Sequence, residues 1–145
     1  MTTLSALMNQ QSASDRTPHV QRVLVVEDEL PLRKVVARNL SSRGIHVFEA
    51  GNAAEAIRAA TIDRPDLLLL DINLPDQTGW DVLRELKRRG TNIPTIVVSA
   101  VRVNQSRVDE FQPVAYLHKP FPIDALLRLV LHERNASRDE PPEDQ

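Results

Sequence analysis

Five side chains with useful chemistry stand at or just after short apolar runs of this sequence. The first run is followed by two acids, and a run of four leucines is followed by a third. Two later runs lead to a hydroxyl and an ammonium group. If the runs are parallel strands of one sheet, their carboxyl ends share one edge, where open α/β sheets hold their chemistry. The residues are Glu27, Asp28, Asp71, Ser99 and Lys119.

Three carboxylates on one edge repel one another unless a cation balances their charge. Mg²⁺ suits them, because it prefers hard oxygen ligands and keeps several of its waters. Zinc fits less well, since the chain has no cysteine and its four histidines are not clustered. An oxygen-bound Mg²⁺ beside a lysine and a hydroxyl is typical of phosphoryl transfer, with Asp71 as the candidate nucleophile.

Each of these residues also has an ordinary structural interpretation. Asp71 taken alone could end a strand and face water. The acids Glu27 and Asp28 could simply precede a helix, where negative charge is favourable. Ser99 could be a helix N-cap, and Lys119 could be a surface lysine. Each alternative is plausible for one residue, whereas the five residues together favour a site.

The run Leu67–Leu70 is the centre of the predicted fold. It shows no period of two, which is typical of a strand buried on both faces of a parallel sheet. A buried helix is the alternative, because leucine is not the strongest strand former. Pro65 and Pro75 limit the run to strand length and argue against that helix.

Other apolar runs of strand length alternate with segments of helical periodicity. This alternation predicts one α/β domain with a doubly wound five-stranded parallel sheet, a flavodoxin-like three-layer sandwich. The polar residues of the second strand place it near the edge of the sheet. The predicted strands are 22–26, 45–49, 66–71, 94–99 and 114–117. The predicted helices are 31–43, 53–61, 80–89, a short or frayed one within 101–111, and 122–133.

Composition limits the classes of function. A hydrophobic share of 41% allows a real core, and a net charge of −2 gives no electrostatic reason to bind nucleic acid or an anionic membrane. No apolar run reaches membrane-spanning length and no secretory signal begins the chain, so we expect a cytoplasmic protein. Residues 1–21 are polar and residues 134–145 are charged, so both are predicted to be disordered around a domain at 22–133.

The motifs, taken together, resemble the receiver domain of two-component response regulators. The resemblance covers about residues 22–133, with the motifs in the family's order on alternating strands. Each fragment alone is common, but the ordered set is highly specific. The matching stretches are Val26–Glu29, Leu70–Pro75 with Gly79, Val98–Ala100 and Tyr116–Phe121.

The resemblance implies a role for each acid. Asp71 would accept a phosphoryl group from the phosphohistidine of a histidine kinase or of a phosphotransfer protein. Asp28 and Asp71 would bind Mg²⁺, Glu27 would do so directly or through water, and the backbone carbonyl of Asn73 would complete the protein ligands.

The resemblance also implies a switch. Ser99 and Lys119 would bind the phosphoryl group, and movement of Ser99 would leave space that the ring of Tyr116 turns inward to fill. An ordinary half-buried strand aromatic is the alternative for Tyr116. In the family, the peptide bond before the proline that matches Pro120 is usually cis.

The chain departs from the family between Ser99 and Lys119. This segment is slightly shorter than expected, and Gln112 and Pro113 stand where a Gly-Ala pair is frequent. We therefore predict a shortened fourth helix, and a partner contact that differs from the usual one.

We expect a stand-alone regulator, because only about a dozen residues follow Glu133. Its output would be a protein-binding face with a downstream protein target, without nucleic acid or membrane, and its only catalysis would be its own phosphorylation and dephosphorylation. A receiver fold that acts as a phosphorylation-independent interaction module is the main alternative. An aspartate-based phosphohydrolase is disfavoured, because Asn73 stands where that class has a second acid. A dinucleotide enzyme is disfavoured by the lack of a glycine-rich loop.

Overall fold

Strands and helices alternate along the part of the chain that the structure, a computed structural model, describes. These are residues 21–138, with side chains described as far as residue 133. The elements are β1 (Arg22–Val26), α2 (Leu30–Ser41), β2 (His46–Ala50), α3 (Ala53–Ile62), β3 (Leu67–Asp71), α4 (Gly79–Arg88), β4 (Thr95–Ser99), α5 (Gln105–Phe111), β5 (Ala115–His118) and α6 (Ile123–Arg138).

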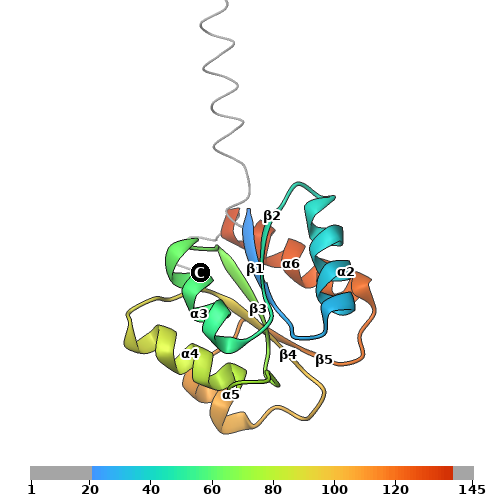
Figure 1. The fold of residues 1–145 in the computed structure, drawn as a ribbon. Helices are drawn as coiled ribbons and strands as arrows, with labels where there is room; N and C mark the ends of the chain where they lie inside the picture. The colour runs from blue at the N-terminus through green and yellow to red at the C-terminus, as the bar shows by residue number, and fades with distance from the viewer. Residues whose placement is uncertain (1–20, 139–145) are drawn as a thin grey trace, which may run out of the picture.

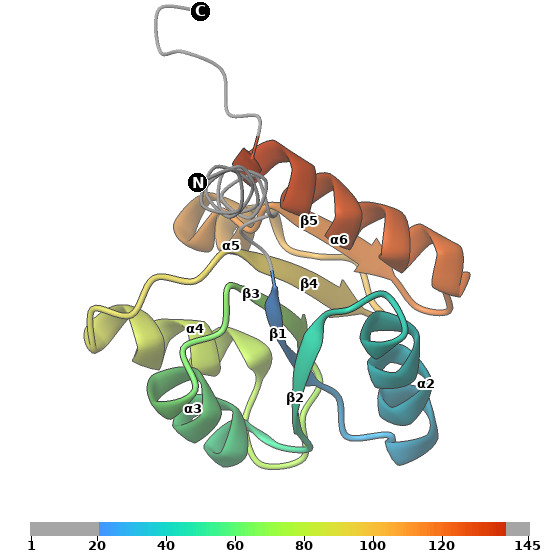
Figure 2. The same ribbon diagram turned by 90° about the horizontal axis from the view of Figure 1, so that it is seen from above.

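The five strands form one parallel sheet in the order β2-β1-β3-β4-β5. Figures 1 and 2 show α2 and α6 on one face of the sheet and α3, α4 and α5 on the other. This confirms the predicted doubly wound, flavodoxin-like sandwich, with β2 as an edge strand. The chain reverses its direction across the sheet between β1 and β3, and such a switch point is where ligands bind in open α/β sheets.

Strand β3 is buried along its whole length, as its lack of a period of two predicts. Leu67 and Leu69 pack in the core beneath α2 and α6. Leu68 and Leu70 pack in the second core, beneath α3 and α4. Because both faces of the strand are covered, every position is apolar until the strand reaches Asp71 at its end.

Helix α5 is the short helix that the departure from the family predicts. It has seven residues, and none of them is buried. It ends at Phe111, because the next residue, Gln112, has a left-handed φ of 49° that cannot continue a helix. Pro113 follows directly and reinforces the stop.

Helix α6 is longer than predicted. The expected end was Glu133, but the helix continues to Arg138. No glycine or proline interrupts the sequence until Pro141, and Ala136 and Arg138 are good helix formers. Disorder was predicted for residues 1–21 and 134–145. Residues 134–138 belong to α6 instead, and the prediction for residues 1–20 and 139–145 lies outside the described residues and stays a prediction.

No helix within residues 21–138 combines the length and the apolar character that a membrane crossing requires.

We predict that Leu68→Ala lowers the free energy of unfolding by about 2–5 kcal/mol, because the side chain is fully buried and its loss leaves a cavity. Urea unfolding followed by circular dichroism measures this. Ile62→Ala is the matched control: its side chain is 68% exposed, so the change should be within about 0.5 kcal/mol. Equal losses in the two variants would contradict the assignment of β3 as the core strand.

Candidate functional site

Three acids gather where β1 and β3 end. Glu27 and Asp28 follow β1, and Asp71 is the last residue of β3, which pairs directly with β1. One carboxylate oxygen from each acid lies within 4.8 Å of the other two. Glu27 and Asp71 are only 5% and 3% exposed, whereas Asp28 is exposed. The carboxyl edge of the sheet thus carries a cluster that is open to solvent on one side.

Lys119 reaches into this cluster from the loop after β5. Its Nζ lies 2.8 Å from Glu27 Oε1, 3.0 Å from Asp71 Oδ2 and 3.4 Å from Glu29 Oε1. Its backbone N–H donates to the carbonyl of Ser99, and the Lys119–Pro120 peptide bond is cis. The ammonium group therefore offsets part of the negative charge that β1 and β3 bring together.

Burial decides the electrostatics of Glu27. It raises the pKa of the Glu27 carboxyl to about 7, and repulsion from Asp71 acts in the same direction. Hydrogen bonds from Lys119 and from the backbone N–H of Glu29 oppose the rise but do not cancel it. Burial alone would lower the pKa of Lys119, but its hydrogen bonds to Glu27 and Asp71 hold that pKa above its ordinary value.

The cluster fits a hard divalent cation. All three groups are carboxylates, which Mg²⁺ prefers. Opposite ligands of an octahedral Mg²⁺ lie about 4.2 Å apart, close to the 4.8 Å that bounds the oxygen separations here. The N–H of Asn73 donates to Asp71 Oδ1 at 3.0 Å, so the chain turns back over the end of β3 and keeps the Asn73 backbone beside the acids.

Gly79 keeps the loop from β3 to α4 tight. A Cβ on Gly79 would lie 2.8 Å from the carbonyl oxygen of Asp71 and 2.9 Å from the Cα of Ile72, which is closer than real contacts allow. The Gly79 N–H donates to the Ile72 carbonyl at 2.7 Å. Only a residue without a side chain lets α4 start this close to Asp71.

Asp76 ties the same loop to α3. Its two carboxylate oxygens accept from the N–H groups of Ala53 (2.8 Å) and Ala54 (3.1 Å), at the start of that helix. The hydrogen bond from Ala53 is the main reason that the pKa of Asp76 lies below its ordinary value. Sequence reasoning did not single out Asp76, because its partners are more than twenty residues away.

Ser99 and Tyr116 lie on the neighbouring strands β4 and β5. The Ser99 side chain is buried, and its hydroxyl donates to the carbonyl of Val101 (2.8 Å) and accepts from the Val101 N–H (3.1 Å). Tyr116 is 48% exposed. In this structure the hydroxyl therefore bonds to its own loop, and the ring lies outside the core.

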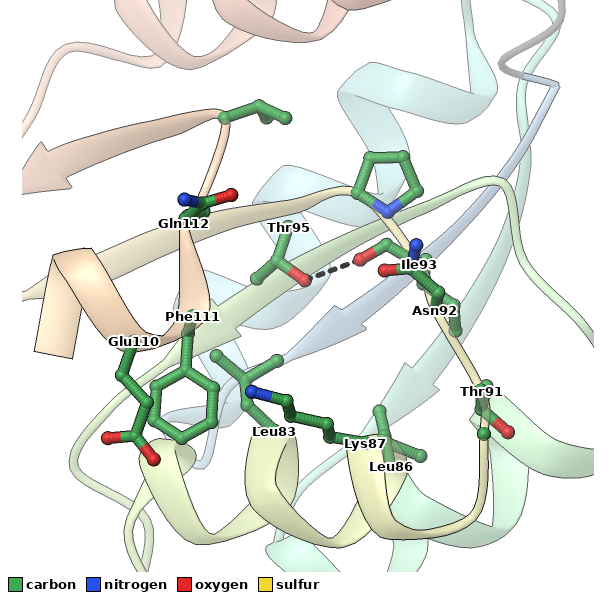
Figure 3. A pocket seen from close by; sticks show the side chains of 13 residues that line it. Leu83, Leu86, Lys87, Thr91, Asn92, Ile93, Thr95, Glu110, Phe111 and Gln112 are labelled. Carbon is green, nitrogen blue, oxygen red and sulfur yellow. Dashed lines mark hydrogen bonds between the residues drawn. The ribbon is translucent and has the colours of Figure 1, made fainter.

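A hollow of about 590 Å³ lies between α4, α5 and the loop that enters β4 (Figure 3). Its wall includes Phe111, whose ring stacks on Trp80 with the centroids 5.8 Å apart. Residues 91–95 and Val114, which line it, lie at the amino ends of β4 and β5. The hollow is thus at the opposite end of the sheet from the acids and is not part of their site.

Comparison with known proteins gives one consistent result. The family model for the response regulator receiver domain matches residues 23–131. The response regulator MprA of Mycobacterium ulcerans is 36% identical over 124 residues, which are 82% of this chain and 53% of MprA. The KDP operon transcriptional regulatory protein KdpE of Escherichia coli is 36% identical over 120 residues, 79% of this chain and 53% of KdpE. The chain spans about half the length of these curated relatives.

Solved structures give the same fold. A CheY-like receiver domain protein from Methanospirillum hungatei superposes with a TM-score of 0.76 at 23% identity, covering 84% of this chain and 99% of that one. The response regulator TrrA of Thermotoga maritima, solved with Mg²⁺ and BeF, has a TM-score of 0.69 at 27% identity and covers 78% of this chain and 98% of its own.

We predict that Glu27 makes the metal-free protein less stable as the pH rises from about 5 to about 7. With a pKa of about 7 when folded and 4.5 as the ordinary value, the folded state binds the proton more tightly. The stabilisation from the bound proton is complete below pH 4.5 and is lost as the pH rises through about 7. The unfolding free energy should change by at most about 1.4 kcal/mol per pH unit.

Urea unfolding in EDTA across this pH range, on wild type and Glu27→Gln, measures the effect. The unfolding free energy of wild type minus that of the variant should fall with rising pH, because glutamine does not titrate. A difference that does not change with pH would contradict the raised pKa.

Proposed function

Since the chain belongs to the response regulator receiver domain family, we propose that its Asp71 accepts a phosphoryl group in a Mg²⁺-dependent reaction. The donor would be the phosphohistidine of a histidine kinase or of a phosphotransfer protein. The observation that carries the proposal is the buried Asp71 carboxylate, held by the Asn73 N–H on one oxygen and by Lys119 on the other.

The transfer uses few parts of the protein. An oxygen of Asp71 attacks phosphorus, the P–N bond of the phosphohistidine breaks, and its electron pair stays on the imidazole nitrogen. Bound Mg²⁺ supplies positive charge that offsets the phosphoryl oxygens. Glu27, Asp28, Asp71 and the Asn73 carbonyl would hold that cation. The Lys119 Nζ is already 3.0 Å from Asp71 Oδ2 and can form an ion pair with a phosphoryl oxygen once the group is on Asp71.

Ser99 and Tyr116 form the proposed switch. A hydrogen bond from the Ser99 hydroxyl to a charged phosphoryl oxygen contributes about 1.5–3 kcal/mol. Because about 1.4 kcal/mol is a tenfold change in population, this bond shifts a two-state equilibrium by tenfold or more. Ser99 must first leave Val101, and the half-exposed Tyr116 ring then turns into the space that the hydroxyl vacates.

The output we propose is a protein-binding face controlled by this switch. The described domain carries a short α5 with no buried residue, so we expect a partner contact unlike that of receivers with a longer helix here. The KdpE relative is a transcriptional regulator, and a transcriptional output belongs to that protein. A phosphorylation-independent interaction module is the second candidate, but it requires none of the acids and the lysine that gather on the carboxyl edge.

We predict that acetyl phosphate with Mg²⁺ adds one phosphoryl group to the wild-type chain and none to Asp71→Asn, because the amide is not a nucleophile for phosphorus. Intact-mass spectrometry measures this. Asp124→Asn, an exposed acid on α6, is the matched control and should be modified like wild type. EDTA should abolish the modification. A wild-type chain that gains no phosphoryl group would favour the interaction module instead.

We also predict that Mg²⁺ and beryllofluoride slow the nitration of Tyr116 by tetranitromethane about tenfold or more, because the ring turns inward. Tyr116 is the only tyrosine, so total nitration reports on this ring alone. In Ser99→Ala the ring should stay reactive, whereas Ser106→Ala, an exposed hydroxyl on α5, should behave as wild type. Protection that survives in Ser99→Ala would remove the hydroxyl from the switch.

A further inference from the structure

Arg33, on the first turns of α2, reaches back to the loop that carries two of the acids. Its Nη1 donates to the backbone carbonyl of Glu27 at 2.8 Å, and its Nε donates to Glu49 Oε1 at 3.1 Å. The Arg33 side chain is only 18% exposed. Glu49 is in turn held by Lys34 at 3.1 Å. The guanidinium is thus fixed between an edge strand and the end of β1.

The backbone of Glu27 is therefore held on both sides. Its N–H donates to the Ala50 carbonyl at 3.0 Å, and its carbonyl accepts from Arg33. That carbonyl belongs to the planar peptide that leads into Asp28. Holding this peptide plane in place also sets the direction of the Asp28 backbone and, through it, of the Asp28 side chain.

Asp28 depends on this backbone more than the other two acids do. Glu27 receives hydrogen bonds from Lys119 and from the N–H of Glu29, and Asp71 receives them from Lys119 and the N–H of Asn73. Within residues 21–138, no donor contacts the exposed Asp28 carboxylate. The backbone of Glu27 and Asp28 therefore sets the position of the Asp28 carboxylate among the three acids.

Gly51 leaves the space that the guanidinium uses. A Cβ on Gly51 would lie 2.7 Å from Arg33 Nη1. Gly51 does not have a positive φ, so its backbone puts no strain on another residue, and the Arg33 tip is what an added Cβ would have to displace. An alanine there pushes the flexible tip of Arg33 away from the Glu27 carbonyl without straining the backbone.

We propose that Arg33 is a positioning residue for the cation site: it orients the Glu27–Asp28 peptide so that both carboxylates face Asp71. The proposal rests on the proposed function of the acid cluster. A positive charge near a cation site repels the cation. If Arg33 acted only through its charge, removing it would tighten Mg²⁺ binding. If Arg33 positions the acids, its removal weakens binding instead, and the sign separates the two roles.

The test is the Mg²⁺ dissociation constant of the full chain by isothermal titration calorimetry, with no phosphoryl donor present. Arg33→Met keeps an unbranched apolar stem but removes the guanidinium and its donors, and should weaken binding about 10-fold, as loss of groups behind metal ligands does. Gly51→Ala should weaken it similarly. Lys34→Met removes the same charge from the same partner, Glu49, without touching Glu27, and should bind Mg²⁺ as wild type does or more tightly.

Thermal unfolding in EDTA separates positioning from a purely structural role. Unchanged Mg²⁺ binding in Gly51→Ala, or a lower melting temperature of Arg33→Met with unchanged Mg²⁺ binding, overturns the proposal. If Arg33→Met does not fold, Gly51→Ala decides alone. Asp28→Asn is the reference for the site: if it binds Mg²⁺ as tightly as wild type, the proposed function fails as well.

Discussion

The balance of charge at the end of β3 is the constraint on which the site depends. Glu27 and Asp71 are buried carboxylates at the ends of adjacent strands, and such a pair is stable only beside a positive charge or a bound proton. Lys119 supplies the charge, while burial still raises the pKa of the Glu27 carboxyl. The three acids that gather there offer oxygen ligands of the kind that a divalent cation prefers, so the packing of the sheet creates a candidate cation site.

Strand order is what brings these groups together. The chain places β2 outside β1 and then crosses to β3, so the ends of β1 and β3 are neighbours although more than forty residues separate them. The two hydrophobic cores hold that order, because β3 alternates its leucines between them. Burial of Leu67–Leu70 in the two cores therefore holds β3 in place, and with it Asp71 at its end.

The fold was predictable because its signals are local. The leucine run between two prolines, the acids after apolar runs and the early stop of α5 each follow from a few adjacent residues. Arg33 was not predictable in the same way: its partners are the Glu27 carbonyl, just after β1, and Glu49 on β2, and the residues next to Arg33 point to neither. The orientation of the Ser99 hydroxyl and the end of α6 were also beyond the pattern, because a side-chain rotamer and a gradual helix end leave no periodic trace.

Helix α5 has a further consequence for the mechanics of this domain. It buries none of its residues, and its aromatic contact is the stacking of Phe111 on Trp80 of α4. Such a segment opens at a far smaller energy than the strands beside it, so its amides should exchange with solvent long before those of the sheet. The domain can therefore unfold and refold α5 locally while the sheet keeps its structure.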